Sequence, residues 1–402
     1  MVIFPSRSQT MLSDLSSGLQ GEINQLYRLR REIESQGCSI TDLVAGNVTR
    51  HGIVFPPALL EEILPAAARR TSIYLPDPLG QSGAREAISQ YYRQSGVEIP
   101  ASRILLTPGT SISYWYSFKL LADHGDEILC PRPSYPLFDY IAALSGVKMI
   151  SYPLDENRGW QIDLDRLEST ISTRTRAVVL ISPHNPTGHV AGVAELEGLA
   201  EIARRHGLAL ISDEVFGEFL LGSGGLPRAA EFDSPLVVTL NGFSKMFALP
   251  GLKLGWMALT GDPAEVARAM SALELISDTF LPVSELVQNC VSEIFEEGRQ
   301  FLSSYAAEIR NRWAIARRLL SGMPACRFVD PAGGFYVTLD IGGIDEEQAA
   351  EEILRKANIL VHPGHFYDID PQHLVFSFVQ EPEIIQEALA EVRRVISEMQ
   401  RS

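Results

Sequence analysis

The stretch from residue 236 to residue 256 constrains the fold and the chemistry of this chain more than any other segment. An apolar, β-branched run at 236–240 predicts a buried strand of a parallel sheet. After it come a Ser-Lys pair, a Pro-Gly turn, a second cation and a Gly-Trp pair, namely Ser244, Lys245, Pro250, Gly251, Lys253, Gly255 and Trp256. A lysine among small residues at a strand end has room to reach a carbonyl group, and partial desolvation lowers its pKa. The whole pattern favours Schiff-base chemistry at Lys245, whereas an isolated Ser-Lys pair would indicate a surface loop.

Strands alternate with helices between residues 100 and 260, which predicts a doubly wound α/β domain with a mostly parallel sheet. Ligands of such sheets bind beyond the carboxyl ends of the strands. Chemically useful residues follow five of the predicted strands, at Gly109, Tyr135, Asn185, Asp213 and Lys245. We therefore expect a single site built from these strand ends.

Three of these strand ends have a chemistry that the residues themselves indicate. Gly109 precedes a predicted helix that begins with Thr110 and Ser111, and free N–H groups, the helix dipole and two hydroxyls suit a phosphate. Ordinary N-capping explains the same three residues. Asp213 ends a buried strand, where a carboxylate is costly unless it is paired with a positive charge. Tyr135 is flanked by prolines, and its ring can stack on a flat ligand or pack in the core.

The spacing Ser-Lys, four residues, Pro-Gly-Leu, cation, hydrophobic residue and Gly-Trp resembles the cofactor-lysine signature of the fold-type I pyridoxal phosphate enzymes. More narrowly, it resembles that of the class I/II aminotransferases, over nearly the whole chain. The resemblance implies the PLP-transferase fold, with a large α/β domain, a smaller α+β domain and pyridoxal 5'-phosphate (PLP) as cofactor. It implies that Lys245 forms an aldimine with PLP and later acts as general acid and base. Asp213 would pair with the protonated pyridine nitrogen, which keeps the ring an electron sink.

The resemblance assigns roles to further residues. Asn185, in an Asn-Pro-Thr-Gly turn, would offer its amide to the cofactor's phenolate oxygen and contact the substrate. Gly46 would bring backbone N–H groups close to the substrate carboxylate, although a plain turn glycine explains it as well. Tyr74 would reach the phosphate across a homodimer interface, unless it packs locally. The remaining cofactor-binding residues would be Gly109, Thr110, Ser111, Tyr135, Ser244 and Lys253. His184 is expected to be a loop histidine and Glu214 a structural carboxylate.

The sequence departs from the family pattern at four positions. Phe216 stands where a tyrosine is usual, Gly242 where a phosphate-binding hydroxyl is common, and Lys253 where arginine is usual. Val375 stands where the family has an arginine that binds the α-carboxylate of the substrate. Another cation (Arg85, Arg132 or Lys253) takes over that task, or backbone N–H groups suffice, or the substrate lacks a conventional α-carboxylate.

The length of the chain, 402 residues, predicts two domains. We expect a large PLP-binding domain at 51–284. Residues 1–50 and 285–402 would form a discontinuous small domain that includes an N-terminal arm. The resemblance also implies a homodimer, since Tyr74 can act on the phosphate only from the other subunit.

Composition argues against several classes of partner. A formal net charge of −16 offers no excess of Lys and Arg for nucleic acid. No apolar run reaches the ~18 residues that span a membrane, and the N-terminus lacks a signal-peptide pattern, so a cytoplasmic protein is expected. Four scattered cysteines indicate free thiols, and His362 and His365 lack further metal ligands, so we expect no metal site.

Together these features predict a PLP-dependent aminotransferase of amino acid metabolism that moves an amino group between an amino acid and a 2-oxo acid. Val375 and Phe216 also prompt an alternative, namely a lyase, decarboxylase or cyclase on the same fold. A second alternative is a non-catalytic module such as the effector-binding part of a transcription regulator. Residues 1–45 are too few and too mixed in charge for the DNA-binding domain that such a regulator carries.

Overall fold

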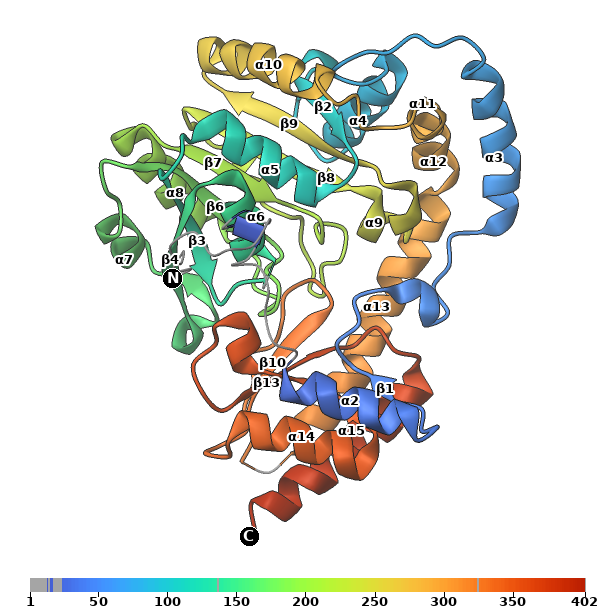
Figure 1. Cartoon of the computed structure of the whole chain (residues 1–402), viewed down its shortest axis with the longest axis vertical. Helices are drawn as coiled ribbons and strands as arrows, with labels where there is room; N and C mark the ends of the chain where they lie inside the picture. Colours follow the sequence, from blue (N-terminus) through green and yellow to red (C-terminus); the bar gives the residue numbers. More distant parts are fainter. Residues whose placement is uncertain (1–12, 14, 17–23, 136, 324, 402) are drawn as a thin grey trace.

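The computed structural model describes residues 13, 15–16, 24–135, 137–323 and 325–401 (Figure 1). Its centre is an eight-stranded sheet with the order β2-β9-β8-β7-β6-β3-β4-β5. The strands are β2 (Ile104–Thr107), β3 (Glu127–Arg132), β4 (Lys148–Asp155), β5 (Gln161–Ile162), β6 (Thr175–Ile181), β7 (Ala209–Asp213), β8 (Leu236–Gly242) and β9 (Gly255–Gly261). Neighbouring strands from β8 to β4 are parallel, while β9 and β5 pair antiparallel with their neighbours. The predicted doubly wound, mostly parallel sheet is therefore confirmed.

Helices cover both faces of this sheet, which is why its strands are apolar throughout. Val238 on β8 packs in a cluster with α5 (Thr110–Leu121) and α10 (Pro263–Asp278), and its neighbour Val237 packs in the cluster that contains α8 (Val193–His206). Shorter helices complete this part of the chain: α3 (Pro57–Arg70), α4 (Ser82–Gln94), α6 (Phe138–Ser145), α7 (Leu164–Ser169) and α9 (Phe243–Met246). Because successive side chains of a strand point to opposite faces, both valines are buried.

A second, smaller sheet lies below the first in Figure 1, with helices at its side. It is antiparallel in the order β10-β13-β12, formed by β10 (Tyr336–Asp340), β13 (His373–Ser377) and β12 (His362–Pro363). The helices of this region are α2 (Gln25–Ser35), α13 (Arg299–Leu320), α14 (Glu346–Ala357) and α15 (Pro382–Met399). β1 (Thr41–Asp42) joins the N-terminal segment to β11 (Ile359–Leu360) as a parallel pair. The division into 1–50 plus 285–402 and 51–284 stays a prediction.

The sequence predicts one or two amphipathic helices at 8–37, a short strand at 40–47 and helix from 264 to about 318. The structure corrects two of these expectations. The segment 264–318 was expected to be helical throughout, but α10 ends at Asp278 and α11 (Glu285–Gln288), α12 (Val291–Glu297) and α13 follow as separate helices. The expected strand at 40–47 has only two residues of strand, because the following backbone bonds the Asp42 side chain: Val44 N and Ala45 N both donate to Asp42 Oδ1. Of the helices expected at 8–37, α2 is described, and much of the remainder lies outside the described residues.

No helix in the described part of the chain combines the length and the apolar character needed to span a bilayer. All four cysteines are free thiols: Cys130 and Cys290 are buried, Cys326 is partly buried and Cys38 is exposed.

Candidate active site

Lys245 is the third residue of the short helix α9, which starts directly after β8. Its Nζ donates a hydrogen bond to the Gly46 carbonyl oxygen at 2.7 Å. The rings of Phe216 and Phe335 lie 5.7 and 5.9 Å from the same nitrogen. Burial among these groups lowers the pKa of Lys245 to about 8. A lysine in this state holds a useful fraction of neutral amine near neutral pH, which a nucleophile requires.

Gly46 is the first residue that the structure places beside Lys245. A Cβ on Gly46 would overlap the hydroxyl of Tyr336 and would lie 3.1 Å from Lys245 Nζ. The close approach of these two side chains, rather than a special backbone conformation, therefore requires glycine. Tyr336, on β10, is a site residue that sequence reasoning missed. The sequence feature that could have indicated it is the aromatic pair at 335–336, in a strand that the sequence assigned to the small domain.

Asp213 ends β7 and is buried. Its carboxylate accepts hydrogen bonds from the Tyr114 hydroxyl at 2.8 Å and from Val215 N at 3.0 Å. Burial raises the pKa of Asp213 to about 6, and those two hydrogen bonds oppose the rise. Within the described residues no basic side chain pairs with this carboxylate. Asp213 is thus prepared for a positive partner that the chain itself does not provide.

Tyr114 was also missed by the sequence reasoning. It lies in the second turn of α5, one helical turn after Thr110, and is buried against the sheet. Burial and the nearby Asp213 carboxylate raise the pKa of Tyr114 well above its usual value, so the phenol stays a donor. The available signal was the helical spacing of four residues from Thr110, which places both residues on one face.

Asn185 follows β6 in the loop that the sequence predicted. Its amide Oδ1 is buried and has no partner in the described part of the chain. The neighbouring His184 is buried, bonds Thr187 Oγ1 through Nδ1 at 2.9 Å, and has a pKa lowered to about 3 by burial. A histidine held neutral inside this loop fits the structural role expected of it, and Asn185 has the amide free for a ligand.

Glycines lie close together at the phosphate site that the sequence predicts at Gly109. Gly109, with φ of 133°, precedes α5, and a Cβ on Gly255 of β9 would lie 3.0 Å from its Cα. A Cβ on Gly242 would in turn lie 2.9 Å from the Gly255 Cα and 2.8 Å from the Leu254 carbonyl oxygen. This contact explains the departure at Gly242, since a serine there would collide with the backbone of β9. The hydroxyls of Thr110 and Ser111, at the open end of α5, make no hydrogen bond within the described residues.

Ser244 and Lys253 border the same region. Ser244 is partly buried at the start of α9, directly before Lys245. Lys253 is exposed, and its backbone is left-handed with φ of 51°. Tyr135, in the loop after β3, is 40% exposed and meets Phe138 edge-on at 6.3 Å between centroids. Most of one ring face is therefore available to a ligand.

Glu214 is buried and paired with Arg228, whose guanidinium bonds it directly and also contacts the Tyr91 hydroxyl at 3.1 Å. This pair is structural, as the sequence indicated. Phe216 is buried too, with its ring against Phe335 at 4.9 Å and Tyr336 at 6.3 Å. No hydroxyl at position 216 faces Lys245.

The cations that could replace an arginine at Val375 differ in how far their donors are already hydrogen-bonded within the chain. Arg85 is held by three groups, the Asp77 carboxylate and the carbonyl oxygens of Gly80 and Ala101. Arg132 is exposed and donates from Nε to the Asp368 carbonyl oxygen at 3.0 Å. Val375 itself is fully buried in the small sheet. Lys253, the third candidate, is exposed. Among the described residues, none of these three cations is shown in contact with Val375.

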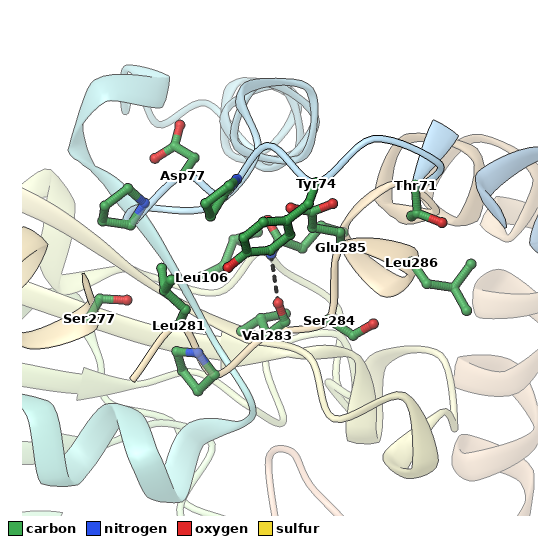
Figure 2. A pocket seen from close by; sticks show the side chains of 15 residues that line it. Thr71, Tyr74, Asp77, Leu106, Ser277, Leu281, Val283, Ser284, Glu285 and Leu286 are labelled. Atoms are coloured by element: carbon green, nitrogen blue, oxygen red, sulfur yellow. Dashed lines mark hydrogen bonds between the residues drawn. The ribbon is translucent and has the colours of Figure 1, made fainter. Parts of the chain in front are cut away.

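Tyr74 lies in the loop between α3 and α4 and is 69% exposed. It borders a cavity of about 470 Å³ that Leu106, Leu281 and Glu285 also line. Figure 2 shows the Tyr74 ring extended across this cavity. Its exposed neighbours Ile73 and Leu75 leave this segment without an apolar cover inside the described chain. The phosphate contact expected of Tyr74 across a dimer stays a prediction.

His362 and His365, three residues apart, bond different groups. His362 Nε2 lies 2.8 Å from the Tyr27 hydroxyl, and His365 Nδ1 lies 2.9 Å from Glu346 Oε1. In the described residues no group of three potential metal ligands gathers anywhere.

Comparisons with known proteins cover almost the whole chain. Residues 40–392 match the family model for aminotransferase class I and II. A glutamate–pyruvate aminotransferase of Haemophilus influenzae is 29% identical over 389 residues, which cover 91% of this chain and 93% of the relative. The crystal structure of an Escherichia coli aminotransferase has a TM-score of 0.84 at 26% identity and covers 93% of this chain and 95% of that one. An alanine aminotransferase from Pyrococcus furiosus shares the fold, with a TM-score of 0.89 at 24% identity over 96% of this chain and 100% of that one.

Proposed function

The chain belongs to the class I and II aminotransferases, and from this premise we propose which of its residues perform the reaction. It is a PLP-dependent transaminase that moves an amino group between an amino acid and a 2-oxo acid. The observation that carries the residue assignment is Lys245, an amine with a pKa of about 8 at the ends of the parallel strands.

The groups around Lys245 suit PLP. Asp213 is a buried carboxylate without a basic partner in the described residues, and a protonated ring nitrogen would provide one. The side chain of Asn185 is not held by the chain, since its buried Oδ1 has no partner in the described residues, and its amide NH2 would donate to the phenolate oxygen of the ring. The open N-terminus of α5 and the hydroxyls of Thr110 and Ser111 would meet a phosphate. Gly109, Ser244, Lys253 and Tyr135 border the same space in our proposal.

We assign two tasks to Lys245. Its neutral amine would hold the cofactor, and the same amine, when free, would move a proton at the amino-bearing carbon of the substrate. PLP would supply an electron-accepting ring that makes this carbon acidic. Asp213, fixed by Tyr114 and Val215, would hold the ring nitrogen positive. The carbonyl oxygen of Gly46 accepts a hydrogen bond from Nζ and so orients the amine at the strand ends.

The test is amino transfer by purified, PLP-loaded protein. The name of the Haemophilus relative suggests glutamate and pyruvate as the first pair, so alanine formation is measured. We expect Lys245→Ala to lower the rate by about 10²-fold or more, because the proton-transfer group is lost. Lys356→Ala, an exposed lysine of α14, is the matched control. Wild-type transfer by Lys245→Ala, or a borohydride-fixed adduct on another peptide, would refute the assignment. Ammonia or carbon dioxide in place of alanine would point to a different reaction.

We further propose a cytoplasmic homodimer. The exposed segment Ile73, Tyr74 and Leu75 supports the dimer, since three neighbouring side chains, each about 70% exposed, are unusual for a free surface. In such a dimer Tyr74 would reach the phosphate of the other subunit. No nucleic acid and no membrane partner is proposed.

A further inference from the structure

The substrates of this enzyme place a particular demand on the site. In an amino acid and in its 2-oxo acid, a carboxylate is bonded directly to the carbon that exchanges the amino group. When that carbon reacts next to Lys245, the carboxylate must lie within a few ångströms of Lys245 Nζ. A carboxylate taken from water needs hydrogen-bond donors or a cation to replace its hydration.

The nearby cations are already engaged or exposed. Arg85 donates from each of its three nitrogens, to the Asp77 carboxylate and to the carbonyl oxygens of Gly80 and Ala101. Arg30, on α2, is paired with Glu34 and Asp42. Arg132 keeps part of its guanidinium free, but it lies exposed at the end of β3 and is tied to Asp368. The donor for the carboxylate must therefore be sought among neutral groups as well.

One face of the small sheet provides the wall of the site opposite Lys245. Val337 of β10 lines a cavity with Ala316 and Leu389, so the odd-numbered face of β10 packs on α13 and α15. Tyr336 and Thr338 point to the other face, because side chains alternate along a strand. Val375 pairs directly with Thr338, and thus shares that face.

The histidine on this wall, His362, is uncharged. His362 pairs with Val375 on the other side, and burial lowers the pKa of its imidazole to about 4. The imidazole nitrogens are occupied by the hydroxyls of Tyr27 at 2.8 Å and Tyr367 at 3.1 Å. His362 is therefore uncharged near pH 7 and has no nitrogen left for a substrate.

Tyr336 provides a hydrogen-bond donor on this wall, close to the reacting nitrogen. Its hydroxyl occupies the space that a Cβ of Gly46 would need, and Lys245 Nζ lies 3.1 Å from that Cβ position. The residue is only 9% exposed, and its hydroxyl makes no hydrogen bond within the described residues. Burial raises the pKa of Tyr336 well above its usual value, so the phenol keeps its proton. The hydroxyl of this largely buried side chain is therefore available to donate to a ligand in the site.

We propose that Tyr336 binds the carboxylate of the amino acid or 2-oxo acid substrate through its neutral hydroxyl, beside the backbone of Gly46. Tyr336 is then a specificity-determining residue, and it does the work that the buried Val375 cannot do. The proposal rests on the function proposed above, because it assumes that the substrate reacts at Lys245. A neutral donor also predicts that carboxylate binding depends only weakly on ionic strength.

The test compares two ligands of the PLP-loaded enzyme, 2-aminoisobutyrate and tert-butylamine. They differ only in a carboxylate against a methyl group, and neither has a hydrogen on the amino-bearing carbon, so both bind without turnover. Binding is followed by the absorption of the bound cofactor. We expect Tyr336→Phe to weaken 2-aminoisobutyrate by roughly 10- to 100-fold, the loss of one hydrogen bond to a charged group, and to change tert-butylamine by less than about twofold.

Two control variants separate this role from a structural one. Tyr305→Phe removes a buried, unpartnered tyrosine hydroxyl whose ring packs on Phe335, and it should leave both ligands unaffected. Arg132→Gln tests the remaining cation. Equal weakening of both ligands by Tyr336→Phe would show a structural role and overturn the proposal. So would a selective loss in Arg132→Gln but not in Tyr336→Phe. Alanine formation by the wild type is measured in parallel, and its absence would refute the transaminase function rather than this assignment.

Discussion

At the scale of single residues, the surroundings of Asp213 suit a positively charged partner, and without that partner its ionised carboxylate lowers the stability of the folded chain. Its carboxylate is buried, accepts two hydrogen bonds and has no basic partner in the described chain, so its pKa rises to about 6. An Asp raised from its usual pKa of about 4 binds its proton more tightly in the folded state than in the unfolded state. The folded apoprotein is thereby penalised above pH 6, and the penalty vanishes as pH falls towards 4.

This reasoning predicts that Asp213→Asn stabilises the apoprotein. The neutral amide keeps its oxygen for Val215 N–H, its NH2 group can donate to the Tyr114 hydroxyl oxygen, and it carries no buried charge. We expect the free energy of unfolding at pH 7.5 to increase by about 1–3 kcal/mol, and the gain to shrink to nothing near pH 4. Urea unfolding of apo wild type and variant at several pH values measures it. A loss of stability at pH 7.5 would mean that the carboxylate contributes to folding.

A second expectation at this scale concerns Lys245, whose pKa of about 8 lies below its usual value. The unfolded chain binds this proton more tightly, so the amine penalises the folded apoprotein below pH 8, and the penalty disappears as pH rises towards 10. Lys245→Met should therefore be more stable than wild type at pH 7 by about 1–3 kcal/mol, with a smaller difference at pH 9.5. Thermal unfolding of the two apoproteins across this pH range would show it. A difference independent of pH would contradict the titration.

At the scale of elements, the site depends on how tightly β8, β9 and α5 meet. Gly242 and Gly255 are cross-strand partners, and Gly109 lies against Gly255 from the start of α5. The absence of side chains lets the open end of α5 approach the beginning of α9, where Lys245 lies. The same contact makes a hydroxyl at 242 impossible without displacement of β9. The phosphate would then be held by α5 and by Ser244 rather than from position 242.

We therefore predict that Gly242→Ala destabilises the protein and weakens PLP binding together. The added Cβ would lie 2.8 Å from the Leu254 carbonyl oxygen, which must move. Overpacking of this kind costs about 1–3 kcal/mol. Gly251→Ala is the matched control, since its Cβ would meet nothing within 4 Å, and it should change stability by less than about 0.5 kcal/mol. Thermal unfolding and a PLP titration measure both effects, and an unchanged Gly242→Ala would contradict the close packing.

At the scale of the whole molecule, the small sheet lies opposite the strand ends of the large sheet, and Lys245 lies between them. Gly46 and Tyr336 come from the N-terminal segment and from β10, and they meet a lysine about 100 to 200 residues away in sequence. The loop with Tyr74 lies at the β2 edge of the large sheet, beside β2 and the end of α10. Its exposed apolar side chains suggest where a second copy binds.

The homodimer is tested by a charge in that segment. The chain has a mass of 44.3 kDa, and we expect the wild type to have about twice that mass in solution. Leu75→Glu, at a side chain that is 68% exposed, should shift the protein to a monomer and weaken PLP retention. Val193→Glu, an exposed apolar position at the start of α8, should leave the mass unchanged. Light scattering measures the mass of each protein in solution. A Leu75→Glu variant that is still a dimer would exclude this surface as the interface.

Local patterns were sufficient for the parts of the site that lie along one stretch of chain. The Ser-Lys pair after an apolar strand, the Gly-Thr-Ser start of α5 and the aspartate at the end of β7 could be read because each function depends on a strand end and the turn that follows it. Regular alternation of strands and helices predicted the large sheet for the same reason. Breaks within the helical segment 264–318 were not predicted, because packing against α3 and α4 decides where those helices stop.

Contacts between distant segments could only come from the tertiary structure. That Tyr114 supports Asp213, that Gly242 lies against β9, and that Tyr336 fills the space beside Gly46 all depend on how separate elements approach within a few ångströms. The sequence by itself determined the class of chemistry, and it predicted Lys245 and Asp213 as the residues that hold the cofactor. The packing of the small sheet against the strand ends decided that Tyr336 lies beside Gly46 and Lys245, because no periodicity in the sequence encodes the distance between β10 and Lys245.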